Sequence, residues 1–196
     1  MATKEEIQDN QNTEIKVSQS TNDTGPLHTF FLDALKDMLW AENTILTGLQ
    51  KMKKAATNEE LIEAFEDHEF QSKRHVSRLK RVFEMMGEKA ESKKCIAMDG
   101  LLKEAQEIIQ STPEGTATRD AALIIAAQKV EHYEIATYGG LVQIALTLDM
   151  PEIANLLEKT LEEEEDTDYI LTEIAESFIN FEAATEDTEE TENKVK

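Results

Sequence analysis

The chain alternates between long stretches in which apolar residues recur every three or four positions and short polar stretches without that spacing. Apolar residues at this spacing share one face of an α-helix, so the long stretches predict amphipathic helices. Four long helices are predicted, over about 26–56, 57–87, 119–148 and 149–180, with a shorter one over 101–111. The pattern therefore predicts two helical hairpins joined by a long connection, an all-α four-helix bundle with a short crossover helix.

Residues at the ends of these stretches indicate where the helices begin and end. Pro26 suits a first helical turn, because its φ angle is already helical and its missing N–H is not needed there. Thr57 is expected to cap the second helix, with Glu60 reaching back in a capping box, and Gly87 is expected to end it. Asp149 is the expected cap of the last long helix.

Both ends of the chain lack large apolar residues. Residues 1–25 are rich in Asn, Thr, Ser, Gln and Glu, and residues 181–196 are acidic. Such segments bury too little apolar surface to offset the entropy lost on ordering. We therefore expect a disordered arm over 1–25, the bundle over 26–180 and an acidic disordered tail over 181–196.

The composition of the chain indicates where the protein is located and which kinds of partner it is expected to bind. The 196 residues are 40% hydrophobic and include only one cysteine, Cys95, which suits one domain in a reducing cytoplasm. The N-terminal sequence lacks the apolar stretch of a secretory signal. A net charge of −21 repels phosphate groups, so we expect neither nucleic acid nor a membrane as a partner. The same charge is typical of a soluble surface, and it attracts cations.

Acidic residues and histidines interrupt the apolar face of every long helix near its midpoint. Because each lies about halfway along its helix, we expect them to converge inside the bundle. His132 is left out of this set, since it points about 140° away from the acidic face of its helix. The predicted site residues are Glu42 on the first long helix, His68 and His75 on the second, Glu131 and Glu134 on the third, and Glu164 and Asp168 on the fourth.

This set of side chains indicates a metal site. An ionised carboxylate in an apolar core costs several kcal/mol unless it is paired, neutralised or bound to metal. Oxygen and nitrogen ligands suit iron or manganese, and less specifically zinc, whereas the absence of thiolates argues against a structural zinc or iron–sulfur site. Helical bundles with Glu on some helices and Glu-x-x-His on others are a known arrangement for two bridged irons.

Other interpretations of single residues remain open at this point. Glu42 could pair with a Lys or Arg at the edge of the bundle. His68 and His75 could each be core histidines with ordinary hydrogen-bond partners. Tyr133 and Tyr138 could be redox-active neighbours of a metal, although a buried tyrosine more commonly donates a hydrogen bond to a carboxylate.

Four segments resemble the YciE/YciF-type ferritin-like stress proteins: "DMLWAENTILTGLQKM", "KKCIAMDGLLKEA", "AAQKVEHYEIATYGGL" and "LEKTLEEEEDTD". The similarity spans about 27–180. It implies a ferritin-like bundle, commonly a homodimer, in bacteria that respond to osmotic or oxidative stress. It also implies that five acids stand at expected ligand positions: Glu42, Glu131, Glu134, Glu164 and Asp168.

The second helix departs from the family pattern. Where family members tend to have a histidine, an apolar residue and two glutamates, this chain has His68, Glu69, Phe70 and Gln71. Either His68, Glu69 and His75 compensate, or the site holds one ion, binds weakly or is vestigial. The functional hypothesis is a stress protein with an iron site that oxidises ferrous iron or consumes peroxide. The alternative is a non-enzymatic dimeric structural or interaction protein, and whether the chain turns over a substrate stays open.

Overall fold

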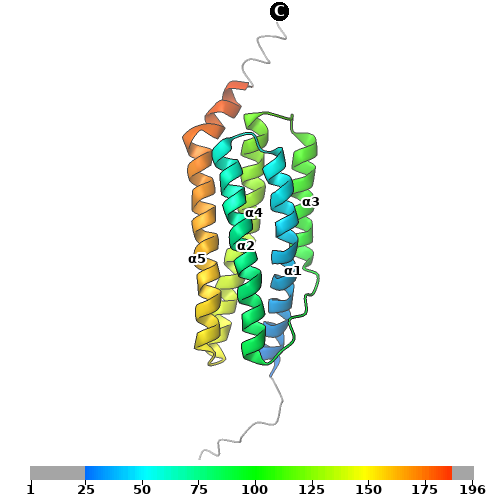
Figure 1. Cartoon of the computed structure of the whole chain (residues 1–196), viewed down its shortest axis with the longest axis vertical. Coiled ribbons are helices and arrows are strands. Elements are labelled where there is room, and N and C mark those ends of the chain that lie inside the picture. Colours follow the sequence, from blue (N-terminus) through cyan, green and yellow to red (C-terminus); the bar gives the residue numbers. More distant parts are fainter. Residues whose placement is uncertain (1–24, 187–196) are drawn as a thin grey trace, which may run out of the picture.

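The computed structural model describes residues 25–186, which form a bundle of helices with no strand among them (Figure 1). Four long helices make the bundle: α1 (Pro26–Ala55), α2 (Glu59–Met86), α4 (Ala117–Thr147) and α5 (Pro151–Ile174). The shorter α3 (Ile96–Ser111) packs against α1 and α4. A π-helical turn, η1 (Ala175–Ile179), follows α5. The predicted all-α four-helix bundle with a short crossover helix is confirmed.

The direction of the helices explains the crossover. In Figure 1, α1 and α5 run one way along the bundle, while α2 and α4 both run the other way. The chain must therefore return along the bundle between α2 and α4, and the connector with α3 makes this return. The connector is fastened to α1 by a hydrogen bond from the Lys93 N–H to the Lys36 carbonyl (3.0 Å). Around the bundle, α1 contacts α2, α2 contacts α5, α5 contacts α4, and α4 contacts α1.

The apolar core is divided into two clusters along the bundle axis. On α1, Leu35 and Met38 belong to one cluster and Ile45 and Leu49 to the other, with buried Glu42 between them. The other three long helices repeat this order of apolar, polar and apolar residues. The predicted site residues are thus placed in a layer across the middle of the bundle, with apolar packing on both sides.

The start of α2 is capped from another helix. The Asn58 side chain accepts a hydrogen bond from the Leu61 N–H (3.0 Å). Buried Asp120 on α4 accepts hydrogen bonds from the N–H groups of Thr57 and Asn58 (2.9 and 2.8 Å) and from the Thr57 hydroxyl (2.7 Å). The expected capping box of Thr57 and Glu60 is therefore wrong, because the Thr57 hydroxyl donates to Asp120. The expected end of α2 at Gly87 is confirmed, since Gly87 adopts a left-handed φ of 70°.

Two other helix starts differ from the prediction. Met150, not Asp149, precedes the first residue of α5, and no side chain caps that helix. Asp149 instead adopts a left-handed φ of 58° in the tight turn between α4 and α5. Helix α3 starts at Ile96, five residues earlier than expected, and Cys95 Sγ accepts a hydrogen bond from the Met98 N–H at its start (3.4 Å).

The C-terminal helix is longer than predicted. Helix continues after η1 through residue 186, six residues past the expected boundary at 180. The Glu186 carboxylate accepts hydrogen bonds from the N–H groups of Ala117 (2.8 Å) and Thr118 (3.0 Å) at the start of α4. This contact gives the last turn a tertiary partner, which periodicity could not show. The rest of the predicted arm, residues 1–24, and of the predicted tail, residues 187–196, lies outside the described residues.

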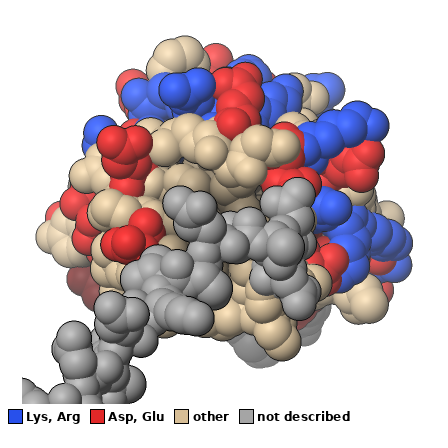
Figure 2. Space-filling view, turned by 90° about the horizontal axis from the view of Figure 1, so that it is seen from below, with Lys and Arg blue, Asp and Glu red and all other residues tan. Residues whose placement is uncertain are grey.

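The surface carries charges of both signs. At the end of the bundle where α1 begins, Lys and Arg side chains are interspersed with Asp and Glu over the visible face (Figure 2). The excess of negative charge is therefore not gathered at that end. Over residues 25–186, none of the helices is long and apolar enough to cross a membrane.

The Asp120 contacts lead to the first prediction. Replacing Asp120 by Ala leaves the N–H groups of Thr57 and Asn58 without their acceptor in a buried setting. We expect the free energy of unfolding to fall by about 2–3 kcal/mol, measured by urea denaturation. Asp99→Ala is the control, because it removes only partly exposed ion pairs and should cost less than about 1 kcal/mol. Equal losses in the two variants would contradict the role given to Asp120.

The Glu186 contacts lead to the second prediction. Glu186→Ala removes a carboxylate that caps the first turn of α4, so we expect a loss of about 1 kcal/mol of unfolding free energy. Hydrogen exchange of the Ala117 and Thr118 amides should accelerate at the same time. Glu182→Ala changes an exposed carboxylate of the same terminal segment and should leave those amides unaffected. Equal exchange in the two variants would show that the contact contributes nothing.

Candidate metal centre

Six of the seven predicted ligands meet in the layer between the two apolar clusters. They come from all four long helices, and their exposed fractions lie between 0% and 3%. The layer thus contains four carboxylates and two imidazoles that are shielded from bulk water. The six residues are Glu42, His68, His75, Glu131, Glu134 and Glu164.

The six side chains form two overlapping groups. One group contains His68, Glu131, Glu134 and Glu164, and the other contains Glu42, His75 and Glu164. Within each group, one ligand atom of every member lies within 4.8 Å of those of the others. Glu164 belongs to both groups, so its two carboxylate oxygens stand where a carboxylate that bridges two ions would stand. The arrangement fits two ions with one histidine each.

Distances between ligand atoms agree with shared coordination. His75 Nδ1 lies 2.9 Å from Glu164 Oε1 and 3.4 Å from Glu42 Oε1. His68 Nε2 lies 3.4 Å from Glu131 Oε1 and 3.8 Å from Glu164 Oε2. Two ligands with bonds of about 2.1 Å to the same ion lie about 3.0 Å apart at a right angle and about 3.4 Å apart in a tetrahedron. Three of the four contacts fall near this range.

Many of these ligand atoms are buried without a hydrogen bond. Each such atom costs about 1–3 kcal/mol unless something satisfies it, and folded proteins contain few of them. Their concentration at one place is what a cation site requires, so the residues present fit a metal. The atoms are Glu42 Oε2, His68 Nε2, Glu131 Oε2, both carboxylate oxygens of Glu134 and Glu164 Oε2, whereas His75 Nδ1 and Glu164 Oε1 also make no hydrogen bond but lie 2.9 Å apart as an ion pair.

Electrostatics within the layer favours proton binding in the absence of a cation. Burial, and next the negative charge of Glu164, raises the pKa values of Glu131 and Glu134 well above the usual value. Burial also raises the pKa of Glu42, although contact with His75 opposes this effect. A divalent cation would replace these protons, since metal ligands bind in their deprotonated form.

His75 and Glu164 behave as an ion pair. Burial acts to lower the pKa of His75, but its contacts with Glu164 and Glu42 outweigh burial and raise the pKa to about 10. Burial acts to raise the pKa of Glu164, but His75 and then His68 outweigh it and the pKa is lowered. The positive charge of the His75 imidazolium thus stabilises the Glu164 carboxylate in the absence of a metal. His75 must lose its Nδ1 proton when a metal binds.

A carboxylate outside the cluster orients His75. Glu163 Oε2 lies 2.7 Å from His75 Nε2, and Arg78 donates to both oxygens of Glu163 (3.0 and 3.2 Å). Burial opposes ionisation of Glu163, but Arg78 and His75 outweigh it and lower the pKa. Ionised Glu163 therefore accepts the Nε2 proton, which leaves Nδ1 to face the cluster. This is the usual way in which a second carboxylate fixes a metal-binding histidine.

His68 is oriented by neutral partners. Its Nδ1 lies 3.3 Å from the Thr167 hydroxyl and 3.4 Å from Gln71 Oε1. Since Gln71 Oε1 can only accept, His68 Nδ1 is the donor in this contact, and Nε2 is the ring nitrogen left to face the cluster. His68 therefore faces Glu131 and Glu164 through Nε2, whereas His75 faces the cluster through Nδ1.

The ligand register differs from the usual Glu-x-x-His arrangement at two positions. The residue three before His75 is Ser72, where the pattern has Glu, and the residue three after Glu164 is Thr167, where the pattern has His. Glu134 adds a carboxylate from α4, and His68, one turn before Ser72, adds an imidazole beside Thr167. The set still contains four carboxylates and two imidazoles. Of the compensating residues that the sequence suggested, His68 and His75 join the cluster.

The structure separates three other residues from the cluster. Glu69 faces the α1–α2 side, where it binds Lys73 (2.8 Å) and Gln50 (3.2 Å), so it does not compensate for the missing glutamates. Asp168, predicted as a ligand, lies nearer the surface, and its Oδ1 is 3.3 Å from His132 Nε2. His132 itself is exposed, as expected. Asp168 missed the cluster because it is rotated toward the α4–α5 edge relative to Glu164.

The two tyrosines have different partners. Tyr138 donates a hydrogen bond to Glu42 Oε1 (2.6 Å), which is the common role expected for a buried tyrosine. The Tyr133 hydroxyl lies 3.0 Å from Cys95 Sγ, outside the cluster. Glu163 was missed by the sequence analysis because it stands in a run of acidic residues, and only its neighbour Glu164 matched the apolar stripe.

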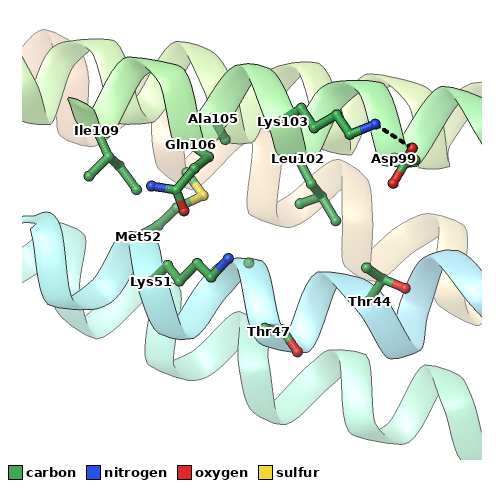
Figure 3. A pocket seen from close by; sticks show the side chains of 11 residues that line it. Thr44, Thr47, Lys51, Met52, Asp99, Leu102, Lys103, Ala105, Gln106 and Ile109 are labelled. Atoms are coloured by element: carbon green, nitrogen blue, oxygen red, sulfur yellow. Dashed lines mark hydrogen bonds and ion pairs between the residues drawn. The ribbon is translucent and has the colours of Figure 1, made fainter. Parts of the chain in front are cut away.

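A groove between α1 and α3 is not lined by a cluster of metal-binding side chains (Figure 3). Its volume is about 210 Å³, and its charged lining consists of Lys51, Asp99 and Lys103, of which the last two form an ion pair (2.9 Å). Leu102 of α3 points toward α1, where a Cβ on Gly48 would stand 2.7 Å from its Cδ2 atom. The absence of a side chain at Gly48 therefore permits this close approach, and the groove is a packing feature.

Comparison with known proteins shows which proteins this chain resembles. YciF from Escherichia coli (strain K12) is 44% identical over 151 residues, which cover 76% of this chain and 90% of that protein. The crystal structure of the E. coli stress protein YciF matches with a TM-score of 0.76 at 42% identity, covering 80% of this chain and 99% of the other. YcfI from Rhodopseudomonas palustris matches with a TM-score of 0.74 at 34% identity, covering 79% and 98%.

A third structure, of protein XCC3681 from Xanthomonas campestris pv. campestris, shares the fold, with a TM-score of 0.64 at 21% identity over 81% of this chain and 97% of the other. The family model described as "Domain of unknown function (DUF892)" matches residues 26–184, which is nearly all of the described bundle. Together with the identity to YciF, this match shows that the chain belongs to the YciF-type family of ferritin-like helical bundles.

Proposed function

We propose that this protein binds two divalent transition-metal ions, with iron as the natural occupant, in the layer between its two apolar clusters. The observation that carries the proposal is the convergence of buried ligand atoms that make no hydrogen bond. His68, Glu131 and Glu134 would hold one ion, and Glu42 and His75 the other. Glu164 would bridge the two ions.

The donor set supports iron over other metals. Carboxylate oxygens with one imidazole per ion are typical of iron and manganese sites in helical bundles, and zinc is a weaker candidate. Four carboxylates also balance the charge of two divalent ions. Cys95 is the single cysteine, and its sulfur contacts Tyr133 and not the cluster.

The proposed role is protection against oxidative stress, since the related YciF is described as a stress protein. Two ferrous ions would supply one electron each to hydrogen peroxide, whose O–O bond breaks to give two hydroxide ions. The chain's own groups would keep bulk water out of the layer, hold Glu42 through Tyr138 and hold His75 through Glu163. Both ferrous iron and peroxide, whose reaction in solution generates radicals, would be removed.

The setting of this activity is also a proposal. We infer a cytoplasmic protein that acts as a homodimer, with metal ions as its small partners and with no nucleic acid or membrane partner. The charge of −21 supports the exclusion of polyanions and favours cations.

A second candidate function is a dimeric structural or interaction protein whose metal site is vestigial. The groove between α3 and α4 favours it, because Ile96 and Ile125 at this groove are 85% and 56% exposed. YcfI from R. palustris is described as a candidate structural protein. A second copy of the chain would cover this groove. Less than roughly a tenth of a metal ion per chain after iron-replete expression would favour this candidate.

The third prediction concerns metal content. Protein expressed with ample iron and purified without chelator should contain about two metal ions per chain by elemental analysis. Glu164→Gln should remove more than half of this metal, since Glu164 belongs to both groups. Glu165→Gln, an exposed neighbour with the same charge change, should retain the wild-type content. Equal metal content in the two variants would contradict the bridging assignment.

The fourth prediction separates metal-free stability from metal binding. Glu134 is fully buried, and neither of its carboxylate oxygens makes a hydrogen bond. Glu134→Gln should therefore stabilise the metal-free protein by about 1–3 kcal/mol at pH 7. The same variant should lose most of the rise in melting temperature that added Co²⁺ gives the wild type, because a metal that binds only the folded form stabilises it. Glu165→Gln serves as the control in both measurements.

The pH dependence of this effect has a definite sign. The pKa of Glu134 is raised in the folded state, so the folded protein holds a proton that the unfolded chain releases above about pH 4.3. The contribution of Glu134 to stability is therefore present at low pH and is lost as pH rises. The stability gain of Glu134→Gln over wild type should grow from pH 4.5 upward in EDTA, and a constant or shrinking gain would contradict the proposed burial of an uncompensated acid.

A further inference from the structure

Access to the buried layer differs among the four sides of the bundle. On the α1–α2 side, Lys53 and Lys73 surround Glu69 at 3.6 and 2.8 Å. These lysines pair with Glu66 and Glu69 and so neutralise the carboxylates that would attract a cation on this side. The α1–α4 side is covered by α3, which contacts both helices.

The α2–α5 side is also guarded by fixed positive charge. Arg74 and Arg78 both contact Glu163, at 3.3 and 3.0 Å, in front of His75. A guanidinium group stays charged at every physiological pH and cannot bind a metal. A cation would therefore meet an unfavourable charge on this side.

The α4–α5 side presents metal-binding side chains instead. His132 Nε2 and Asp168 Oδ1 lie 3.3 Å apart, with side-chain exposures of 70% and 23%. This separation is the one expected for two ligands of a single ion, about 3.0–3.4 Å. Asp168 Oδ1 is buried and makes no hydrogen bond, so the contact with His132 does not satisfy it.

The pair also lies next to the buried layer. Asp168 stands one helical turn after Glu164 on α5, and His132 follows Glu131 on α4. Exposed Glu165, the residue after Glu164 on α5, makes the potential at this edge more negative.

We propose that His132 and Asp168 form an outer site that takes a divalent transition-metal ion from solvent and passes it to Glu131 and Glu164. Water molecules complete the coordination of the ion at this outer site, so it is held weakly there. The buried layer, with more carboxylates and its own imidazoles, binds the ion more tightly and draws it inward. This inference rests on the proposed function, because an entry site has a purpose only if the buried layer binds metal.

The test measures how fast metal-free protein takes up Co²⁺, followed by visible absorption in a stopped-flow instrument, and how much it holds at the end. Asp168→Asn removes a ligand charge and keeps the side-chain shape, and His132→Lys places a fixed positive charge on this side, as on the two guarded sides. We expect each to slow uptake at least about tenfold, with the wild-type final metal content. Glu104→Gln, which changes an exposed carboxylate bonded to Lys129 on the α3–α4 side, should stay within about twofold of wild type.

The outcomes separate the two proposals. Failure of the wild type to bind Co²⁺ would overturn the proposed function itself. Normal uptake rates in both variants would overturn the outer site while leaving the buried centre intact. A lower final content in Asp168→Asn would make Asp168 a permanent ligand and would also overturn the transit role. A peak of anomalous scattering between His132 Nε2 and Asp168 Oδ1, in crystals soaked briefly with Mn²⁺, would support it directly.

Discussion

The structure depends on a layer of four carboxylates and two imidazoles placed across the dry centre of a helical bundle. Apolar packing alone would not choose this arrangement, because each uncompensated buried acid raises the free energy of the folded state. The two apolar clusters above and below the layer must offset that cost. They also fix the position of each helix along the bundle axis. The side chains of the layer meet only if all four helices keep this register, since the layer takes Glu42, His75, Glu134 and Glu164 from different helices.

The layer has the composition of a two-metal site although two positions differ from the Glu-x-x-His pattern. Ser72 and Thr167 occupy places where the Glu-x-x-His pattern of two-metal bundles has a ligand, and Glu134 and His68 supply the missing groups from neighbouring positions. The total of four negative charges and two neutral imidazoles is what two divalent ions need for neutrality. This match in composition supports the proposed metal binding over a vestigial site.

Periodicity was sufficient to predict the long helices and six of the side chains that meet in the layer. It failed where partners distant in sequence decide the structure. Four residues advance a helix by about 400°, so Asp168 is rotated by about 40° from Glu164, which is enough to move it from the layer to the α4–α5 edge. The cap of α2 depends on Asp120, some 60 residues away in sequence, which no local motif reveals. Glu163 could not be distinguished within its acidic run, because its role comes from His75 and Arg78 across the helix interface.

The same division of the core implies that folding does not require the proposed metal binding. In small metal-folded domains the ion replaces a missing apolar core, so the chain unfolds without it. Here each apolar cluster joins residues of all four long helices, and the starts of α2 and α4 are capped by Asp120 and Glu186 independently of the layer. The His75–Glu164 ion pair and the protons on Glu131 and Glu134 make the metal-free layer tolerable. A folded metal-free state can therefore exist and receive ions, which is the condition that any uptake through one side of the bundle requires.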